Sequence, residues 1–308
     1  QMLDKMYDLL ANISKGKPKK TQIKLYKYIG IITNIYIRFR YTLKNRFSKK
    51  NGITDNGEIE VIVSLTSFPA RIHTVFYAIE TLMNQTVKPN KIILWLSKEQ
   101  FSSINHLPKT LLRQRKRGLE IYLVDDDLKG HKKYYYAFRT FPNSKIITFD
   151  DDLLYPSYAI ERLIDKNKEY PNCVCCNRGH EIKIADGKIC SYKEWVKEAI
   201  YLNTPTNCLC PTHGAGALFP VNSVDNDVFC VEKIKKYVYY SDDIWLKAMA
   251  FKKGTKAVYT NDFPQWLFVI RGSQNVTLAQ KNINQNQNDF AISLIMEDYK
   301  FNFKSFKD

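Results

Sequence analysis

The hydrophobic positions between residues 58 and 171 form short, nearly continuous runs separated by helical patterns. The apolar runs are rich in Ile, Leu and Val, as buried strands are, and cover residues 60–65, 91–96, 119–124 and 145–149. Helices are expected between them, at residues 72–84, 108–117, 131–141 and 157–169. Strands that alternate with helices of this length predict an α/β fold with a mostly parallel sheet flanked by helices.

The pattern changes after residue 172. A strand-like run at 173–177 is followed by a less regular region, and a helical region covers 231–253. The segment at 274–289 is rich in Asn and Gln, which predicts a flexible flap or a poorly ordered end.

The pattern also differs before residue 58, where a basic extension is expected over residues 1–57. Residues 23–47 mix Ile, Leu, Tyr and Phe with Lys and Arg, which predicts a basic amphipathic helix, and residues 51–57 resemble a linker. The longest apolar run, residues 28–37, is too short to span a bilayer, and no signal-peptide pattern is present.

Charge makes this extension unusual. Residues 1–52 carry a net +11 of the chain's +16, because thirteen Lys and Arg accompany only Asp4 and Asp8. A basic, aromatic-rich helix suits an anionic membrane surface. Nucleic-acid binding and simple packing on the main domain are the two alternatives.

Three carboxylates, Asp150, Asp151 and Asp152, directly follow the apolar run at 145–149. Adjacent anions repel one another, so their collection at a strand end indicates a positive partner there. Mg²⁺ and Mn²⁺ prefer such oxygen ligands and often share them with a substrate diphosphate. A solvated acidic turn before the next helix is the alternative.

Two further polar segments follow predicted strands, residues 66–71 and the run from Asp125 to Asp127. The carboxyl ends of parallel strands share one edge of a sheet, where ligands bind. The sequence therefore predicts one polar site at this edge.

Five segments, in this order, resemble those of a GT-A fold glycosyltransferase of the family-2-like kind that builds bacterial surface polysaccharides such as capsule or O-antigen. They are Ser64–Ile72 (SLTSFPARI), Lys132–Tyr135 (KKYY), Phe149–Asp152 (FDDD), His213–Gly216 (HGAG) and Ser241–Trp245 (SDDIW). The resemblance covers roughly residues 58–260. It implies one GT-A domain at 58–308, with a donor half at 58–171 and an acceptor half at 172–308.

In such enzymes the Asp-x-Asp motif holds the ribose of a nucleotide-sugar donor and, through a divalent metal, its diphosphate. The resemblance thus implies that Asp150 faces the nucleotide and that Asp152, with Asp150, binds Mn²⁺ or Mg²⁺, while Asp151 could take either role. The other implied donor contacts are Thr66, Ser67, Arg71, Asp125 and Lys133.

Alternatives remain for three of these donor contacts. Arg71 could pair with a nearby carboxylate at a helix start, and Lys133 could lie on a solvated helix face. Asp126 and Asp127 compete with Asp125 for the nucleotide.

The resemblance also implies an acceptor site with a base. An inverting transfer needs a group that takes the proton of the attacking hydroxyl, and Asp243 matches that position, while Asp242 could cap a helix or orient the acceptor. Both could instead be carboxylates favoured by a helix dipole. His213 is expected to complete the metal shell or bind the acceptor, Gly214 to allow close backbone approach, and Trp245 to stack on a sugar or fill the core.

Together these features predict a metal-dependent, inverting hexosyltransferase that uses a nucleotide sugar, with UDP as the default, and a glycan or polyprenyl-linked acceptor. The hexosyl unit could be a pyranose or a furanose. The expected location is cytoplasmic, peripheral to the inner face of the plasma membrane, with no nucleic-acid partner. A sugar-nucleotidyltransferase is disfavoured because residues 66–71 contain no glycine, and a non-catalytic membrane or nucleic-acid binder leaves the acidic strand ends unexplained.

Overall fold

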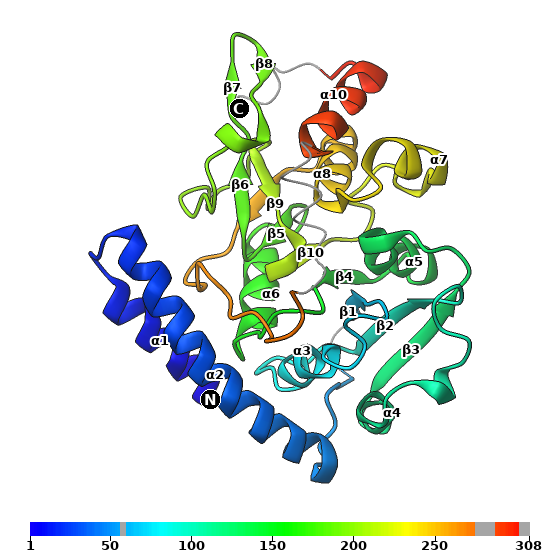
Figure 1. Cartoon of the computed structure of the whole chain (residues 1–308). Helices are drawn as coiled ribbons and strands as arrows, with labels where there is room; N and C mark the ends of the chain where they lie inside the picture. Colours follow the sequence, from blue (N-terminus) through cyan, green and yellow to red (C-terminus); the bar gives the residue numbers. More distant parts are fainter. Residues whose placement is uncertain (56–59, 275–286, 302–308) are drawn as a thin grey trace.

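A seven-stranded sheet runs through the centre of the protein (Figure 1), in the order β11-β5-β10-β4-β1-β2-β3. The computed structural model describes residues 1–55, 60–274 and 287–301. Strand β10 is antiparallel to β4 and β5, and the other neighbours in this sheet are parallel. The strands are β1 (Val61–Thr66), β2 (Lys91–Ser97), β3 (Leu119–Val124), β4 (Lys145–Thr148), β5 (Val174–Cys176), β10 (Ala217–Phe219) and β11 (Ala257–Tyr259).

Helices cover both faces of this sheet. The alternation along β1 and β4 places Val63 and Ile147 in the hydrophobic cluster under α3 and α6, while Ile62 and Ile146 belong to the cluster on the opposite face, near α5. Burial on both faces explains why these strands are continuous apolar runs. The main helices are α3 (Val75–Leu82), α4 (Lys109–Arg115), α5 (Lys132–Thr140), α6 (Ala159–Glu169), α8 (Asp242–Lys253) and α10 (Gln287–Tyr299).

Short elements connect these parts. Two small sheets pair β6 (Gly179–Glu181) with β9 (Leu209–Pro211) and β7 (Ile184–Ala185) with β8 (Lys188–Ile189). Single helical turns are η1 (Ile104–His106), η2 (Lys129–His131), η3 (Tyr192–Glu194), η4 (His213–Ala215), η5 (Asn226–Phe229) and α7 (Val231–Lys233), and α7 continues into a π-helix, η6 (Ile234–Val238).

The predicted α/β class and mostly parallel sheet are confirmed. The four predicted strands before residue 150 correspond to β1 to β4, and the run at 173–177 contains β5. Strands β10 and β11 were not predicted, because three residues are too few to show a period. The predicted helical region at 231–253 is interrupted before α8. Most of the Asn/Gln-rich segment, residues 275–286, lies outside the described residues.

The N-terminal extension forms a hairpin of two helices, α1 (Met2–Ser14) and α2 (Lys19–Phe47), along one edge of the protein (Figure 1). Helix α2 includes the predicted helix, whereas α1 was not predicted. Leu3, Tyr7 and Ile37 of this hairpin are buried in the same hydrophobic cluster as the sheet. One face of the extension therefore packs on the main domain, which is the packing alternative stated above for this segment. No helix within the described residues is long and apolar enough to cross a membrane.

Candidate functional site

A cavity of about 500 Å³ lies at the carboxyl ends of β1 and β4, where α5 and α8 begin. Parallel strands place their polar end segments on this edge, and the two helix starts face it. It is lined by Thr66, Ser67, Phe68, Arg71, Gln100, Asp127, Lys129, Gly130, Lys132, Lys133, Asp150, Asp151, Asp152, Arg178, Tyr192, Tyr240, Ser241, Asp242, Asp243, Ile244, Gln274 and Asn288. Most of the predicted site residues thus meet in one place.

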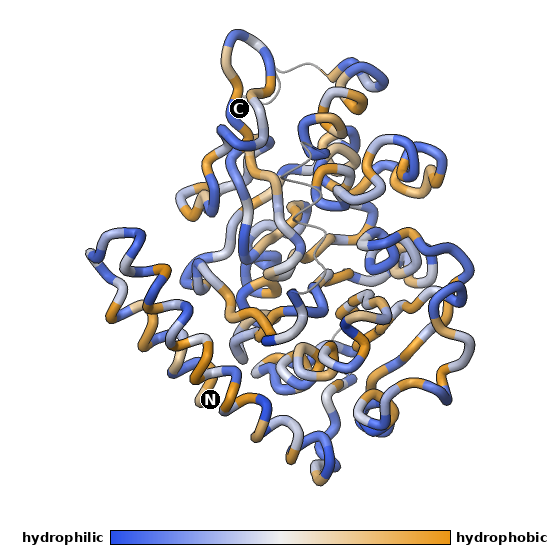
Figure 2. The backbone as a smooth tube through the Cα atoms, viewed as in Figure 1, coloured by the Kyte–Doolittle hydropathy of each residue, from blue (hydrophilic) through white to orange (hydrophobic). Residues whose placement is uncertain are grey.

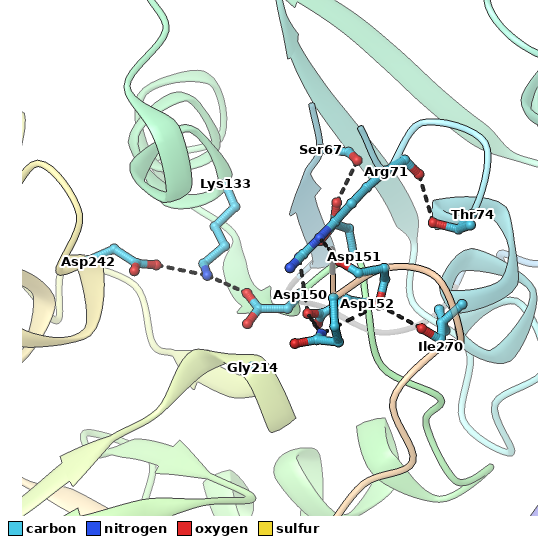
Figure 3. Close-up of polar contacts among 12 residues, drawn as sticks. Ser67, Arg71, Thr74, Lys133, Asp150, Asp151, Asp152, Gly214, Asp242 and Ile270 are labelled. Carbon is cyan, nitrogen blue, oxygen red and sulfur yellow. Dashed lines mark hydrogen bonds and ion pairs between the residues drawn. The ribbon is translucent and has the colours of Figure 1, made fainter. Parts of the chain in front are cut away.

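Asp151 is the most buried of the three strand-end aspartates and anchors the loop after β4 (Figure 3). The Ser67 hydroxyl donates to its Oδ2 at 2.5 Å, and Arg71 Nη1 lies 2.6 Å from its Oδ1. Burial raises the pKa of this carboxyl, and the charge of Arg71 opposes that shift. The alternative proposed for Arg71, a pair with a nearby carboxylate, is therefore observed.

Asp152 connects the cavity to a segment late in the chain, residues 266–274, which we name the strap. Ile270 N donates to the Asp152 carbonyl at 2.8 Å, and Gln274 Nε2 donates to its Oδ2 at 2.7 Å. Arg71 links Asp152 to the strap, since its Nη1 lies 3.0 Å from Asp152 Oδ2 and its Nε donates to the Ser273 carbonyl at 2.8 Å. Burial and the neighbouring Asp151 raise the pKa of Asp152 to about 6.

Lys133 joins the two acidic groups of the cavity (Figure 3). Its Nζ lies 2.7 Å from Asp150 Oδ1 and 2.8 Å from Asp242 Oδ2, and its side chain is only 5% exposed. Burial disfavours the charge, but the surrounding carboxylates, Asp150 first, outweigh burial and raise the pKa of this ammonium. The alternative of a solvated helix face for Lys133 is therefore wrong.

Asp242 and Asp243 are the first two residues of α8, and they differ sharply in their surroundings. Burial opposes the charge of Asp242, but Lys133 outweighs it and lowers the pKa of this carboxyl well below its usual range. Asp243 lies beside His213, whose backbone N donates to Asp243 Oδ1 at 2.9 Å and whose Nδ1 lies 3.1 Å from that oxygen. Burial, together with the charge of Asp242, raises the pKa of Asp243.

One group of side chains among the described residues places three metal-ligand atoms close together. His213, Asp242 and Asp243 each offer one such atom, and these atoms lie within 4.8 Å of one another. His213 Nδ1 is buried and faces both carboxylates, at 3.1 Å from Asp243 Oδ1 and 3.8 Å from Asp242 Oδ2. Carboxylate oxygens and an imidazole nitrogen suit Mn²⁺, so these residues fit a divalent metal by their chemistry. Asp150 and Asp152, the predicted ligands, pair here with Lys133 and Arg71.

Trp245 and Asp125 do not occupy the places predicted for them. Trp245 is fully buried and its Nε1 donates to the Val228 carbonyl, so the predicted stacking on an acceptor is wrong and the core alternative is right. The Asp125 side chain is 84% exposed and pairs with Lys98 instead of lining the cavity. Asp127, its competitor, lines the cavity.

His213 and Gly214 are buried and do not line the cavity, so neither presents a side chain to an acceptor there. His213 is 1% exposed, so its predicted acceptor contact is corrected to a contact with the α8 aspartates. A Cβ on Gly214 would come within 2.7 Å of Asp150 Oδ2, so this glycine admits the carboxylate rather than a sugar. The Tyr155 hydroxyl lies between both loops, 2.8 Å from the Asp150 carbonyl and 2.9 Å from the Gly214 carbonyl, and accepts from Asp150 N at 3.0 Å.

Several cavity residues were missed in the sequence. They include Lys129, Lys132, Arg178, Tyr192 and Gln274. Lys132 pairs with Asp127, and Arg178 Nε donates to Thr212 Oγ1 at 2.7 Å. Arg178 directly follows the predicted strand at 173–177, so the rule that strand ends carry the site could have found it. Nothing in the local sequence marks Tyr192 or Gln274.

No protein-family model and no curated protein matches the chain. Solved structures with partial similarity include a UTP-bound UGPase from Acinetobacter baumannii, at 11% identity and TM-score 0.38, over 79% of this chain and 99% of that one. A 4-diphosphocytidyl-2C-methyl-D-erythritol synthase matches at 10% identity and TM-score 0.41, over 78% of this chain and 100% of that one. A mannosyltransferase from Pyrobaculum calidifontis in complex with GDP-Man and Mn²⁺ matches at 12% identity and TM-score 0.41, over 77% and 66%. Similarities at this level assign neither a family nor an activity to the chain.

Proposed function

We propose that this protein is a metal-dependent glycosyltransferase that moves a hexosyl unit from a nucleotide sugar to a glycan or polyprenyl-linked acceptor with inversion. One observation carries the proposal. Two acidic groups, Asp150–Asp152 and Asp242–Asp243, line the same cavity of about 500 Å³, and Lys133 contacts both. Such a cavity provides separate carboxylates for holding a donor and for taking a proton.

Donor binding needs positive charge for a diphosphate. Arg71, Lys133 and Arg178 line the cavity, and the planar fork of Arg suits phosphate oxygens. A divalent metal, when bound, neutralises the charge that develops on the departing nucleoside diphosphate. Asp150 and Asp152 would hold it according to the resemblance, and His213 with the α8 aspartates is the second fitting set.

Asp243 is the proposed base for the acceptor hydroxyl. About 35% of its side chain is exposed, so it is accessible from the cavity. Its raised pKa increases its affinity for a proton, which favours proton abstraction in the transition state. Asp242 remains ionised beside Lys133 and is better suited to orienting that lysine.

The test is a donor screen. The protein is incubated with UDP-hexoses and UDP-N-acetylhexosamines in Mn²⁺ and again in EDTA, and UDP release is measured. We expect release from one donor class that stops in EDTA, and thermal stabilisation by UDP plus Mn²⁺. Product NMR then gives the anomer and the linkage.

Two outcomes would contradict this function. One is the absence of both nucleotide-sugar hydrolysis and stabilisation by UDP plus Mn²⁺. The other is release of pyrophosphate from UTP and a sugar 1-phosphate, which would identify a nucleotidyltransferase instead.

A further inference from the structure

Helix α2 carries a second apolar surface that the domain does not cover. Six large side chains, three positions apart on average, are more than 40% exposed along its outward face. We name them the outer stripe: Tyr28, Ile31, Ile32, Ile35, Phe39 and Leu43. Over roughly 22 Å of helix, at 1.5 Å per residue, they form a continuous row. Figure 2 shows hydrophobic residues along this helix at the edge of the protein.

The opposite side of α2 already has a partner. Ile29, Ile37 and Tyr41 are buried in the cluster shared with the sheet. A helix that is apolar on two sides needs a second apolar environment, because an exposed apolar row of this size in water is unfavourable. Packing on the domain therefore explains only half of the apolar residues in α2.

The charges around the outer stripe indicate which environment covers it. Helix α2 contains no Asp or Glu. It has exposed basic side chains at Lys20, Lys24, Lys27, Arg38 and Arg46. We propose that the outer stripe docks on the surface of an anionic lipid bilayer, with the stripe in the headgroup and acyl boundary and the basic residues at the lipid phosphates.

Two other occupants fit less well. A second copy of the chain would bring two basic helices together across a two-fold axis, with like charges facing each other. Nucleic acid would use the basic residues but would leave Ile31, Ile35 and Phe39 exposed to water, since phosphates offer no apolar surface.

The helix remains fixed to the domain when it docks. Tyr26 Oη donates to the Leu267 carbonyl at 2.9 Å, and Asn34 Nδ2 donates to the Val269 carbonyl at 2.9 Å. Asn34 Oδ1 also accepts from Arg271 N at 2.7 Å. These bonds tie the inward face of α2 to the strap, so the helix lies flat and docking orients the whole domain. This inference does not rest on the proposed function.

The test measures binding of the full chain to sedimented vesicles of phosphatidylcholine, with and without phosphatidylglycerol. The double variant I35S/F39S removes one aliphatic and one aromatic side chain from the outer stripe. Its matched control is I200S/Y201S, an equally exposed pair elsewhere in the chain. The charge variant K24Q/K27Q is matched by K183Q/K188Q, which are exposed lysines outside the hairpin.

We expect wild-type protein to bind vesicles that contain phosphatidylglycerol, at least tenfold less binding for I35S/F39S, and no change for I200S/Y201S. K24Q/K27Q should weaken binding only to the anionic vesicles, and only at low salt. All these side chains are exposed, so circular dichroism and the melting temperature should not change.

Equal binding of wild type and I35S/F39S would overturn the proposal, as would absence of wild-type binding. A lipid-free dimer of the wild type that I35S/F39S converts to a monomer would also overturn it, because a second copy would then cover the stripe.

Discussion

The cavity has two acidic walls that differ in how their charge is balanced. The strand-end wall consists of Asp150, Asp151 and Asp152, and the helix-start wall of Asp242 and Asp243. In the strand-end wall each carboxylate has a cation as partner, either Arg71 or Lys133. In the helix-start wall Asp242 shares Lys133, whereas Asp243 lies beside His213.

This difference shows that residue type alone does not decide what an aspartate does. Asp151 is enclosed by Ser67 and Arg71 and holds the loop in place. Asp243 has a raised pKa and remains accessible, which suits reversible protonation. The difference fits the proposed division of roles, in which the strand-end wall contacts the donor and the helix-start wall takes the proton.

The largest expected effect is that of Asp152→Asn. Loss of this carboxylate should reduce metal-dependent donor hydrolysis by roughly a thousandfold, because charge stabilisation at the leaving diphosphate is lost. Mn²⁺ binding, followed by electron paramagnetic resonance, should weaken in parallel. Asp126→Asn changes a half-exposed carboxylate that also follows a strand but does not line the cavity, so this control should behave as wild type. If Asp242→Asn abolishes Mn²⁺ binding while Asp152→Asn retains it, the metal belongs to the helix-start wall.

Asp243→Asn tests the other wall. Transfer to the acceptor should fall by roughly a hundredfold to ten-thousandfold, the usual contribution of a general base, whereas UDP binding measured by calorimetry should remain. The matched control is Asp165→Asn, an exposed carboxylate on α6 that does not line the cavity. Wild-type transfer by the Asp243→Asn enzyme would show that another group takes the proton.

Acid is expected to lower the stability of the fold, because His131, next to the start of α8, must then take up a proton. Its Nδ1 contacts the Tyr134 hydroxyl, its Nε2 donates to the Val238 carbonyl just before α8, and burial lowers its pKa from 6.5 to about 4. Between these values the unfolded chain binds a proton that the folded chain does not, so stability is lost as pH falls from about 6.5 towards 4. The loss is about 3.5 kcal/mol at most, given about 1.4 kcal/mol per pKa unit.

The measurement is the free energy of unfolding in urea at several pH values. His131→Gln should flatten the profile between pH 6.5 and 4, even though it lowers stability at pH 7. His180, whose pKa is also lowered by burial, accounts for part of the remaining slope. An unchanged slope in His131→Gln would remove His131 as the acid-sensitive group.

Local sequence patterns were sufficient to predict the buried parallel strands and the polar segments that follow them. Buried parallel strands are continuous apolar runs, so β1 and β4 could be predicted, and the polar residues after them had to lie at one edge. Arg71 and Asp150 therefore line the same cavity as expected, whereas Lys133, on α5, was indicated only by the resemblance.

The remaining site depends on the path of the chain in three dimensions. The sequence of a helix does not show which of its side chains are covered by other elements. Trp245 was therefore predicted as a possible sugar contact, although it is buried in the core. Among three adjacent aspartates after β3, the turn decides that Asp127 and not Asp125 lines the cavity. Tyr192 and Gln274 arrive from irregular segments far along the chain, which no local period describes.

The smallest expected effect concerns the link between α2 and the strand-end wall, which passes through the strap. Asn34→Ala removes the side-chain bonds to Val269 and Arg271 and should cost about 1–3 kcal/mol of stability. Because the strap also holds Asp152, the donor KM should rise by roughly threefold to tenfold while the acceptor KM stays constant.

Asn45→Ala is the matched control for this variant, since Asn45 is also buried in α2 but bonds to Glu80 and Thr110 instead of the strap. It should lower the melting temperature by a similar amount without changing the donor KM. Equal changes in donor KM for both variants would mean that α2 acts only through global stability. A change confined to Asn34→Ala would show that donor binding at the strand-end wall depends on the N-terminal hairpin.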